Sequence, residues 1–221
     1  MTLLSKLVVR MSLGLLFLGT IVFLPAGTLR FWQGWLYLIS WCLPGFAATA
    51  YLYKHDRQLL ERRMQMKERV HEQKLIVGIL YAFYLAGMIT AALDHRFAWS
   101  NVPLWLSLAS WVILMVGYAL VLWVMKVNSF ASRVIRVESG QLVITDGPYH
   151  LVRHPMYFGM SLMLLFTPLV LGSFYALPLF VLVIALIILR LLNEEKVLLQ
   201  HLAGYSDYCL HTRFHLVPYL W

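Results

Sequence analysis

Two short polar stretches of this chain carry side chains that can do chemistry. The first is Arg153-His154-Pro155, which stands just before a long apolar run. Proline suits the first turn of a helix, where its missing N–H would have no partner in any case. Arg153 and His154 are therefore expected beside the first free amides and the positive dipole end of a helix. Such a place favours an anionic group, for example the carboxylate of a ligand.

The second stretch is Glu194-Glu195, at the point where the last apolar segment ends. Two carboxylates beside a membrane are costly unless they are paired or solvated. Arg190 stands four residues before Glu194, so these two side chains can pair along one helix face. Glu195 points about 100° away from Glu194 on an ideal helix, so we expect only one of the two carboxylates to face a given pocket.

The segments that carry these two stretches are expected to be antiparallel neighbours, which brings both stretches to the same end of the molecule. The chain after residue 204 can fold back over them. A site that combines carboxylate, guanidinium, imidazole and aromatic groups beside lipid could take a charged cofactor from water and an apolar substrate from the bilayer. The residues predicted to form it are Asn128, Tyr149, Arg153, His154, Tyr157, Glu194, Glu195, Tyr205, Tyr208 and Arg213.

Each of these signals has an ordinary explanation when it is taken alone. Arg153 could be one of the basic residues that flank membrane helices, and the glutamate pair could be a solvated helix end. Tyr205 and Tyr208 could be interfacial anchors. His150 and His154 are four residues apart and could share a metal ion. No third ligand stands at a suitable spacing, so the sequence predicts no metal site.

The composition places the site in a membrane protein. The chain has 221 residues, of which 61% are hydrophobic and 13% charged, whereas a soluble domain is about half apolar and about a quarter charged. The predicted fold is therefore an all-α integral membrane protein, with a transmembrane scaffold at 1–125 and a catalytic half at 126–221. Six apolar segments are expected to cross or enter the bilayer: Leu7–Ala26, Phe31–Tyr53, Leu75–Leu93, Val102–Met125, Met156–Leu171 and Phe174–Leu192.

The fifth apolar segment is short for a full crossing. Only Gly172 and Ser173 separate it from the sixth, so the two are expected to form a tight helical hairpin. Five full crossings plus one partly crossing helix is the competing count. The first segment begins with Lys6 and Arg10 and then runs apolar, which is the charge pattern of a signal peptide, but it has no convincing cleavage site and is expected to be a retained helix.

Basic residues alternate between the loops. The loop at 54–74 has seven and the loop at 126–155 has four, whereas the two opposite loops have only Arg30 and Arg96. The positive-inside rule then predicts cytoplasmic termini. We expect the membrane to be a bacterial inner membrane. The net charge of +8 follows from this asymmetry and does not indicate nucleic acid. Met64, Met66 and Val70 lie among basic residues, which suits either a helix on the membrane surface or a solvated linker.

Several motifs in the last ninety or so residues resemble the isoprenylcysteine carboxyl methyltransferase family, and the related phospholipid methyltransferases share two of them, Arg-His-Pro and Glu-Glu. The motifs are Asn128-Ser-Phe-Ala-Ser132, Gly147-Pro148-Tyr149, Arg153-His154-Pro155-Met-Tyr157-Phe-Gly159, Glu194-Glu195 and Gly204-Tyr205. This chain departs from the pattern at Asn193 and at Ala203, where relatives more often have a charged residue and phenylalanine.

The resemblance implies a membrane enzyme that uses S-adenosyl-L-methionine, with a cofactor pocket formed by the Arg-His-Pro loop, the following helix and the C-terminal segment. Arg153 and Glu194 would lie nearer the reacting groups or hold the pocket. If the acceptor is an amine, Glu194 or His154 would take its proton. The residues that would bind the cofactor are Asn128, Tyr149, His154, Pro155, Tyr157, Glu195, Tyr208 and Arg213.

Three questions stay open at this point. The acceptor is a lipophilic or isoprenoid-type molecule that could offer a carboxyl, a thiol or a lipid amine, and the oligomeric state is not predicted. A membrane reductase that uses NADPH is the second hypothesis, although Arg153 and Arg213 are thin support for a 2′-phosphate site. A transporter or scaffold without catalysis is the third, although transporters usually place charges near the midplane of the membrane.

Overall fold

The long apolar runs of the sequence form long helices. The computed structural model describes residues 3–64, 71–131, 134–135, 137 and 140–221. Within this range the chain is helical and forms no strand, and residues 141–145 carry no regular secondary structure. The helices are α1 (Leu3–Ala26), α2 (Trp32–His55), α3 (Arg57–Met64), α4 (His71–Phe97), α5 (Leu104–Val127), the short 3-10 helix η1 (Gly147–His150), α6 (Pro155–Val170), α7 (Leu177–His201) and α8 (Tyr205–His211).

Five of the described helices, α1, α2, α4, α5 and α7, are long and apolar enough to cross a membrane. The sixth apolar helix, α6, has 16 residues. At 1.5 Å per residue it is about 24 Å long, which is short of a hydrocarbon core about 30 Å thick. The prediction of an all-α membrane protein is confirmed. By helix length, the count that fits is five crossings plus one shorter helix.

The predicted hairpin of the last two apolar segments is present as α6 and α7. Gly172 lies between them with φ +77°, a left-handed conformation that glycine adopts without strain. The expected start of the sixth segment at Phe174 is three residues early, because α7 begins at Leu177. The helix also runs beyond the expected end at Leu192 to His201, which keeps Glu194 and Glu195 on a rigid helix.

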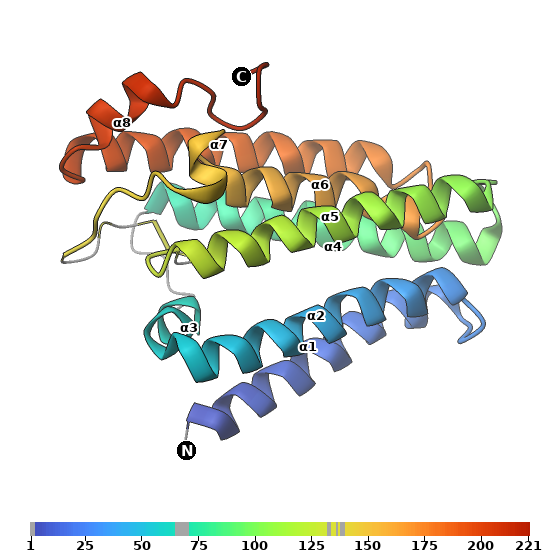
Figure 1. The fold of residues 1–221 in the computed structure, drawn as a ribbon. Coiled ribbons are helices and arrows are strands. Elements are labelled where there is room, and N and C mark those ends of the chain that lie inside the picture. The colour runs from blue at the N-terminus through green and yellow to red at the C-terminus, as the bar shows by residue number, and fades with distance from the viewer. Residues whose placement is uncertain (1–2, 65–70, 132–133, 136, 138–139) are drawn as a thin grey trace.

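Figure 1 shows the long helices lying roughly side by side, and the hairpin of α1 and α2 packs against the other long helices through the contact of α1 with α4. The start of α1, the helix α3, the end of α5, the start of α6 and the end of α7 all lie at one end of this bundle. The helix α8 and the segment after it return over that same end. The polar stretches of the sequence are thereby brought together, and this end is called the site end below.

The helices α5 and α6 approach each other closely at two glycines. A Cβ atom on Gly117 would lie 2.6 Å from the carbonyl oxygen of Gly159, and one on Gly159 would lie 2.7 Å from that of Gly117. Real Cβ atoms do not approach backbone this closely, so both positions need glycine. This contact lies about one turn after Pro155 and holds the start of α6 against α5.

The opposite end of the bundle is held by a buried carboxylate. Asp94, near the end of α4, accepts hydrogen bonds from the Ser100 amide at 2.6 Å and from the Ser173 hydroxyl at 2.5 Å. Ser100 lies before α5 and Ser173 lies before α7, so Asp94 ties two interhelical loops together. The hydroxyl of Ser173 in turn accepts from the amide of Ala176, just before α7.

Part of the expected surface helix is present as α3, which ends at Met64 and buries Leu59 and Leu60. Met66 and Val70, which carried the rest of that expectation, lie outside the described residues. Ser132, the last residue of the motif that begins at Asn128, also lies outside them. The same is true of four of the basic residues counted in the loops, Lys67, Arg69, Arg133 and Arg136.

Candidate active site

The Arg-His-Pro triplet is held in place by the C-terminal segment. The amide of Arg153 donates to the carbonyl of Phe214 at 2.9 Å, and the amide of His154 donates to that of His215 at 3.0 Å. Pro155 then opens α6. The chain after residue 204 therefore folds back over the triplet, as the sequence predicts.

The side chain of Arg153 is the centre of a hydrogen-bond network. Its Nε donates to the carbonyl of Thr212 at 2.7 Å, and its Nη2 donates to that of Cys209 at 3.1 Å. Its Nη1 donates to Oε1 of Glu195 at 2.5 Å. The ion pair is largely buried, with side-chain exposures of 13% for Arg153 and 8% for Glu195. Arg153 thus joins the end of α7 to the segment around α8.

His215 completes this network and was not singled out in the sequence. Its Nε2 lies 3.0 Å from Oε2 of Glu195 and 3.3 Å from Nη1 of Arg153. Its ring stacks on Trp221, with 5.1 Å between the ring centroids. A lone histidine in a tail gives no spacing signal, so only the fold connects it to Glu195. We call Arg153, Glu195 and His215 the ion cluster.

The two adjacent glutamates have different partners. Glu195 belongs to the ion cluster, whereas Oε2 of Glu194 accepts a hydrogen bond from the Tyr157 hydroxyl at 2.5 Å. Both carboxylates therefore reach residues at or just before the start of α6, each with a partner of its own. One turn before Glu194, Nη1 of Arg190 donates to Oε1 of Gln73 at 3.1 Å.

A second set of predicted residues forms hydrogen bonds around Tyr149. The amide group of Asn128 donates to the Tyr149 hydroxyl at 2.7 Å. The hydroxyl of Tyr208 donates to the Tyr149 carbonyl at 2.7 Å. Burial raises the pKa of Tyr149 above its usual range, and burial raises the pKa of Tyr208 to about 12. Both phenols therefore stay neutral and can donate at neutral pH.

Two polar atoms are buried at this site without a partner. Within the part of the chain that the structure describes, neither Nε2 of His154 nor the hydroxyl of Tyr205 has a hydrogen bond. Burial, with smaller effects from the nearby His215 and Arg153, lowers the pKa of His154 to about 3. Burial, and then the charge of Glu195, raises the pKa of Tyr205. Unpaired polar atoms are costly in a protein interior, so each can gain free energy by meeting a ligand.

Aromatic rings surround these polar atoms. The rings of His154 and Tyr157 are 5.9 Å apart in an edge-to-face arrangement, and those of Tyr205 and Tyr208 are 5.7 Å apart. Aromatic faces attract cations such as a sulfonium and stack on flat heterocycles.

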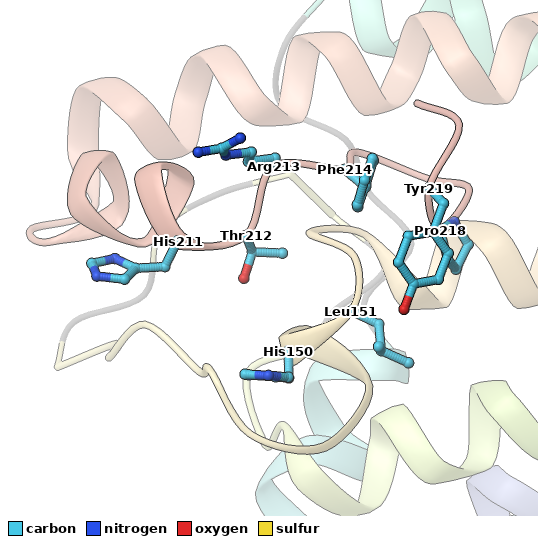
Figure 2. Close-up of a pocket in the computed structure, with 8 residues that line it drawn as sticks. All are labelled: His150, Leu151, His211, Thr212, Arg213, Phe214, Pro218 and Tyr219. Atoms are coloured by element: carbon cyan, nitrogen blue, oxygen red, sulfur yellow. The ribbon is translucent and has the colours of Figure 1, made fainter.

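Arg213 is a predicted site residue that lies at the surface, apart from the ion cluster. Its side chain is exposed, and it lines a cavity of about 220 Å³ together with His150, Leu151, His211, Thr212, Phe214, Pro218 and Tyr219. Figure 2 shows its guanidinium pointing away from Leu151 and Tyr219. His150 is exposed in this cavity, whereas His154 is buried, so the two histidines lie in different surroundings. Among the described residues, no group of three His, Cys, Asp or Glu side chains could hold a metal ion.

Residues 104–204 match the family model for phospholipid methyltransferases. This part, a little under half of the chain, is similar to the phospholipid methyltransferase family. Proteins like isoprenylcysteine carboxyl methyltransferase are members of the same family, so the predicted resemblance is confirmed. A search of the curated proteins finds no match to the chain.

The phospholipid methyltransferase match runs from the start of α5 to the residue before α8. It includes Arg153, Glu194 and Glu195, whereas Tyr208 and His215 follow it. With five helices that can cross a membrane, the match indicates a membrane methyltransferase. It favours this class over the reductase and the transporter.

Proposed function

We propose that this protein transfers a methyl group from S-adenosyl-L-methionine to a lipophilic acceptor at the site end of the bundle. The observation that carries the proposal is the buried polar site in a chain whose residues 104–204 match the phospholipid methyltransferase family. There, Nε2 of His154 and the Tyr205 hydroxyl have no partner among the described residues and lie close to the ion cluster.

The chemical character of the site fits this cofactor. A sulfonium is a cation, and Glu194 and Glu195 bring two carboxylates to the start of α6. The adenine and ribose present flat faces and polar edges, which suit the tyrosine rings and the two unpaired atoms. In this proposal the residues that hold the cofactor are Asn128, Tyr149, His154, Pro155, Tyr157, Glu195, Tyr205, Tyr208 and Arg213.

The cofactor supplies an electrophilic methyl group on sulfur. The part of the protein in such a transfer is to align the acceptor and to exclude water. Arg153 contributes by holding the Arg-His-Pro loop to the carbonyls of Thr212 and Cys209. Since Nε, Nη1 and Nη2 all donate to groups of the protein, we assign Arg153 a positioning role.

The nature of the acceptor decides whether a base is needed. A carboxylate or a thiolate can accept a methyl group directly, whereas an amine must lose a proton. His154 is a poor base because its pKa is lowered to about 3. For an amine acceptor we therefore assign the proton to Glu194, which the Tyr157 hydroxyl orients.

The proposal places the site end at the cytoplasmic face. Arg57, Arg62, Lys126 and Arg153 belong to segments at that end, whereas Arg96 belongs to the end of α4 at the other. This distribution follows the positive-inside rule. Residues 126–221 would carry the chemistry, and residues 1–125 would hold them in the lipid bilayer.

The test is a methyl-transfer assay with radiolabelled S-adenosyl-L-methionine on membranes that contain the protein. We expect label in a lipid-soluble product, and where the acceptor is an amine we expect Glu194→Gln to lose that label. Label in an amine headgroup, a carboxyl ester or a thioether identifies the acceptor class. NADPH consumption without methyl transfer would contradict the proposal and favour the reductase.

A further inference from the structure

Two arginines from the N-terminal half reach the predicted site. Arg62 and Arg63 belong to α3, which lies outside the family match at 104–204. Nη1 of Arg62 donates to the carbonyl of Ser129 at 2.7 Å, and Nη1 of Arg63 donates to that of Ala131 at 2.9 Å. The Arg62 guanidinium also lies over the Phe130 ring, 4.7 Å from its centroid. The two arginines therefore clamp the turn at 128–131.

This turn orients Asn128. Its Oδ1 accepts from the amide of Phe130 at 2.8 Å, and its backbone carbonyl accepts from the amide of Ala131 at 3.2 Å. The side-chain amide group of Asn128 is thus fixed, with Nδ2 donating to the Tyr149 hydroxyl at 2.7 Å. Tyr149 is linked to α8 through Tyr208. A continuous series of hydrogen bonds therefore runs from α3 to the C-terminal helix.

Arg63 has a further contact at the start of α6. Its Nη1 lies 3.6 Å from Sδ of Met156, the residue after Pro155. The same side chain therefore contacts the two segments that flank the predicted cofactor site, the turn after α5 and the first turn of α6.

The helix α3 is itself anchored. Leu59 and Leu60 are buried, and Oδ1 of Asp56 accepts from the Leu59 amide at 2.9 Å. Nη1 of Arg10, in α1, donates to the carbonyl of Met64 at 2.6 Å. Arg62 and Arg63 therefore act from a fixed base, unlike basic residues that only lie near lipid headgroups.

We propose that Arg62 and Arg63 are positioning residues for the cofactor site, which act through the turn at 128–131 on Asn128 and Tyr149. The N-terminal half then contributes to cofactor affinity as well as to membrane anchoring. This inference rests on the proposed function, because it concerns the binding of S-adenosyl-L-methionine.

The test compares Arg62→Gln/Arg63→Gln with Arg57→Gln on the full-length protein in detergent micelles. Arg57 is the matched control, because it belongs to the same helix but its Nε donates to the carbonyl of Tyr53, away from the site. We expect faster amide hydrogen exchange at 130–131 and about tenfold weaker binding of S-adenosyl-L-methionine by calorimetry in the double variant, with neither change in the control.

Two further variants separate positioning from general damage to the fold. Arg62→Gln/Arg63→Lys keeps a hydrogen-bond donor at position 63, so it is expected to bind S-adenosyl-L-methionine more tightly than Arg62→Gln/Arg63→Gln does. Adding Asn128→Ala to the double variant is expected to cost little more, because all three changes break one series of contacts. Equal exchange at 130–131 in the double variant and the Arg57 control would overturn the inference. Wild-type protein that does not bind the cofactor would refute the proposed function, while the exchange comparison would still test the clamp.

Discussion

The ion pair of Arg153 and Glu195 is predicted to stabilise the site end of the protein. Removing one partner of a buried ion pair costs about 3–5 kcal/mol. Glu195→Gln keeps the shape and part of the hydrogen bonding, so we expect a loss of about 3 kcal/mol in the free energy of unfolding. Arg153→Gln also removes the donors to the carbonyls of Thr212 and Cys209. Its cost is therefore predicted to be larger, about 4–5 kcal/mol.

The double variant completes a thermodynamic cycle. We expect Arg153→Gln/Glu195→Gln to be more stable than the sum of the single losses predicts, by about 1–3 kcal/mol. The assay is chemical unfolding in detergent micelles, followed by tryptophan fluorescence. Arg213→Gln is the matched control, because the Arg213 side chain is exposed. Its loss is expected to change the free energy of unfolding by at most about 0.5 kcal/mol. A coupling near zero, or equal losses for Arg153→Gln and Arg213→Gln, would refute the reasoning.

Two further predictions concern packing and protonation. Gly159→Ala is expected to destabilise the protein by about 1–3 kcal/mol, since its Cβ would lie 2.7 Å from the Gly117 carbonyl oxygen. Gly78→Ala is the control, because its Cβ would meet no described atom within 4 Å and alanine suits a helix better than glycine, so thermal unfolding should show no loss of stability for it. Burial lowers the pKa of His154 from about 6.5 in the unfolded chain to about 3. The unfolded state therefore binds the extra proton, and the stability that neutral His154 contributes is complete above pH 6.5 and is lost as the pH falls towards 3. The measurement is the free energy of unfolding, from chemical unfolding, as a function of pH between about 3 and 6.5. We expect its slope against pH to be steeper in the wild type than in His154→Gln, by up to about 1.4 kcal/mol per pH unit, and equal slopes would contradict the prediction.

The helices could be predicted from the sequence because a bilayer imposes their length and apolar character. The short fifth segment, the hairpin at Gly172 and the all-α class follow from these constraints alone. The length of α7 could not be predicted this way. Asn193, Glu194, Glu195 and Lys196 are polar, so the apolar run ends at Leu192, whereas the helix continues to His201 and its Glu195 pairs with Arg153.

The polar cluster could be predicted in outline, since antiparallel neighbours bring Arg153 and the glutamate pair to one end. The individual partners depend on side-chain contacts between distant segments, which spacing does not encode. His215 pairs with Glu195 only because the C-terminal segment folds back. Arg62 and Arg63 look like ordinary basic residues of a membrane loop until their carbonyl partners at 129 and 131 are known.

The most direct test of the central claim is isothermal titration calorimetry of the purified, intact protein with S-adenosyl-L-methionine, its demethylated product and NADPH. We predict binding of the first two with a Kd on the order of micromolar, about −8 kcal/mol, and no binding of NADPH. Glu195→Ala and His154→Ala should weaken cofactor binding at least about tenfold, because each removes a group of the buried site. Binding of NADPH without binding of S-adenosyl-L-methionine would contradict the account.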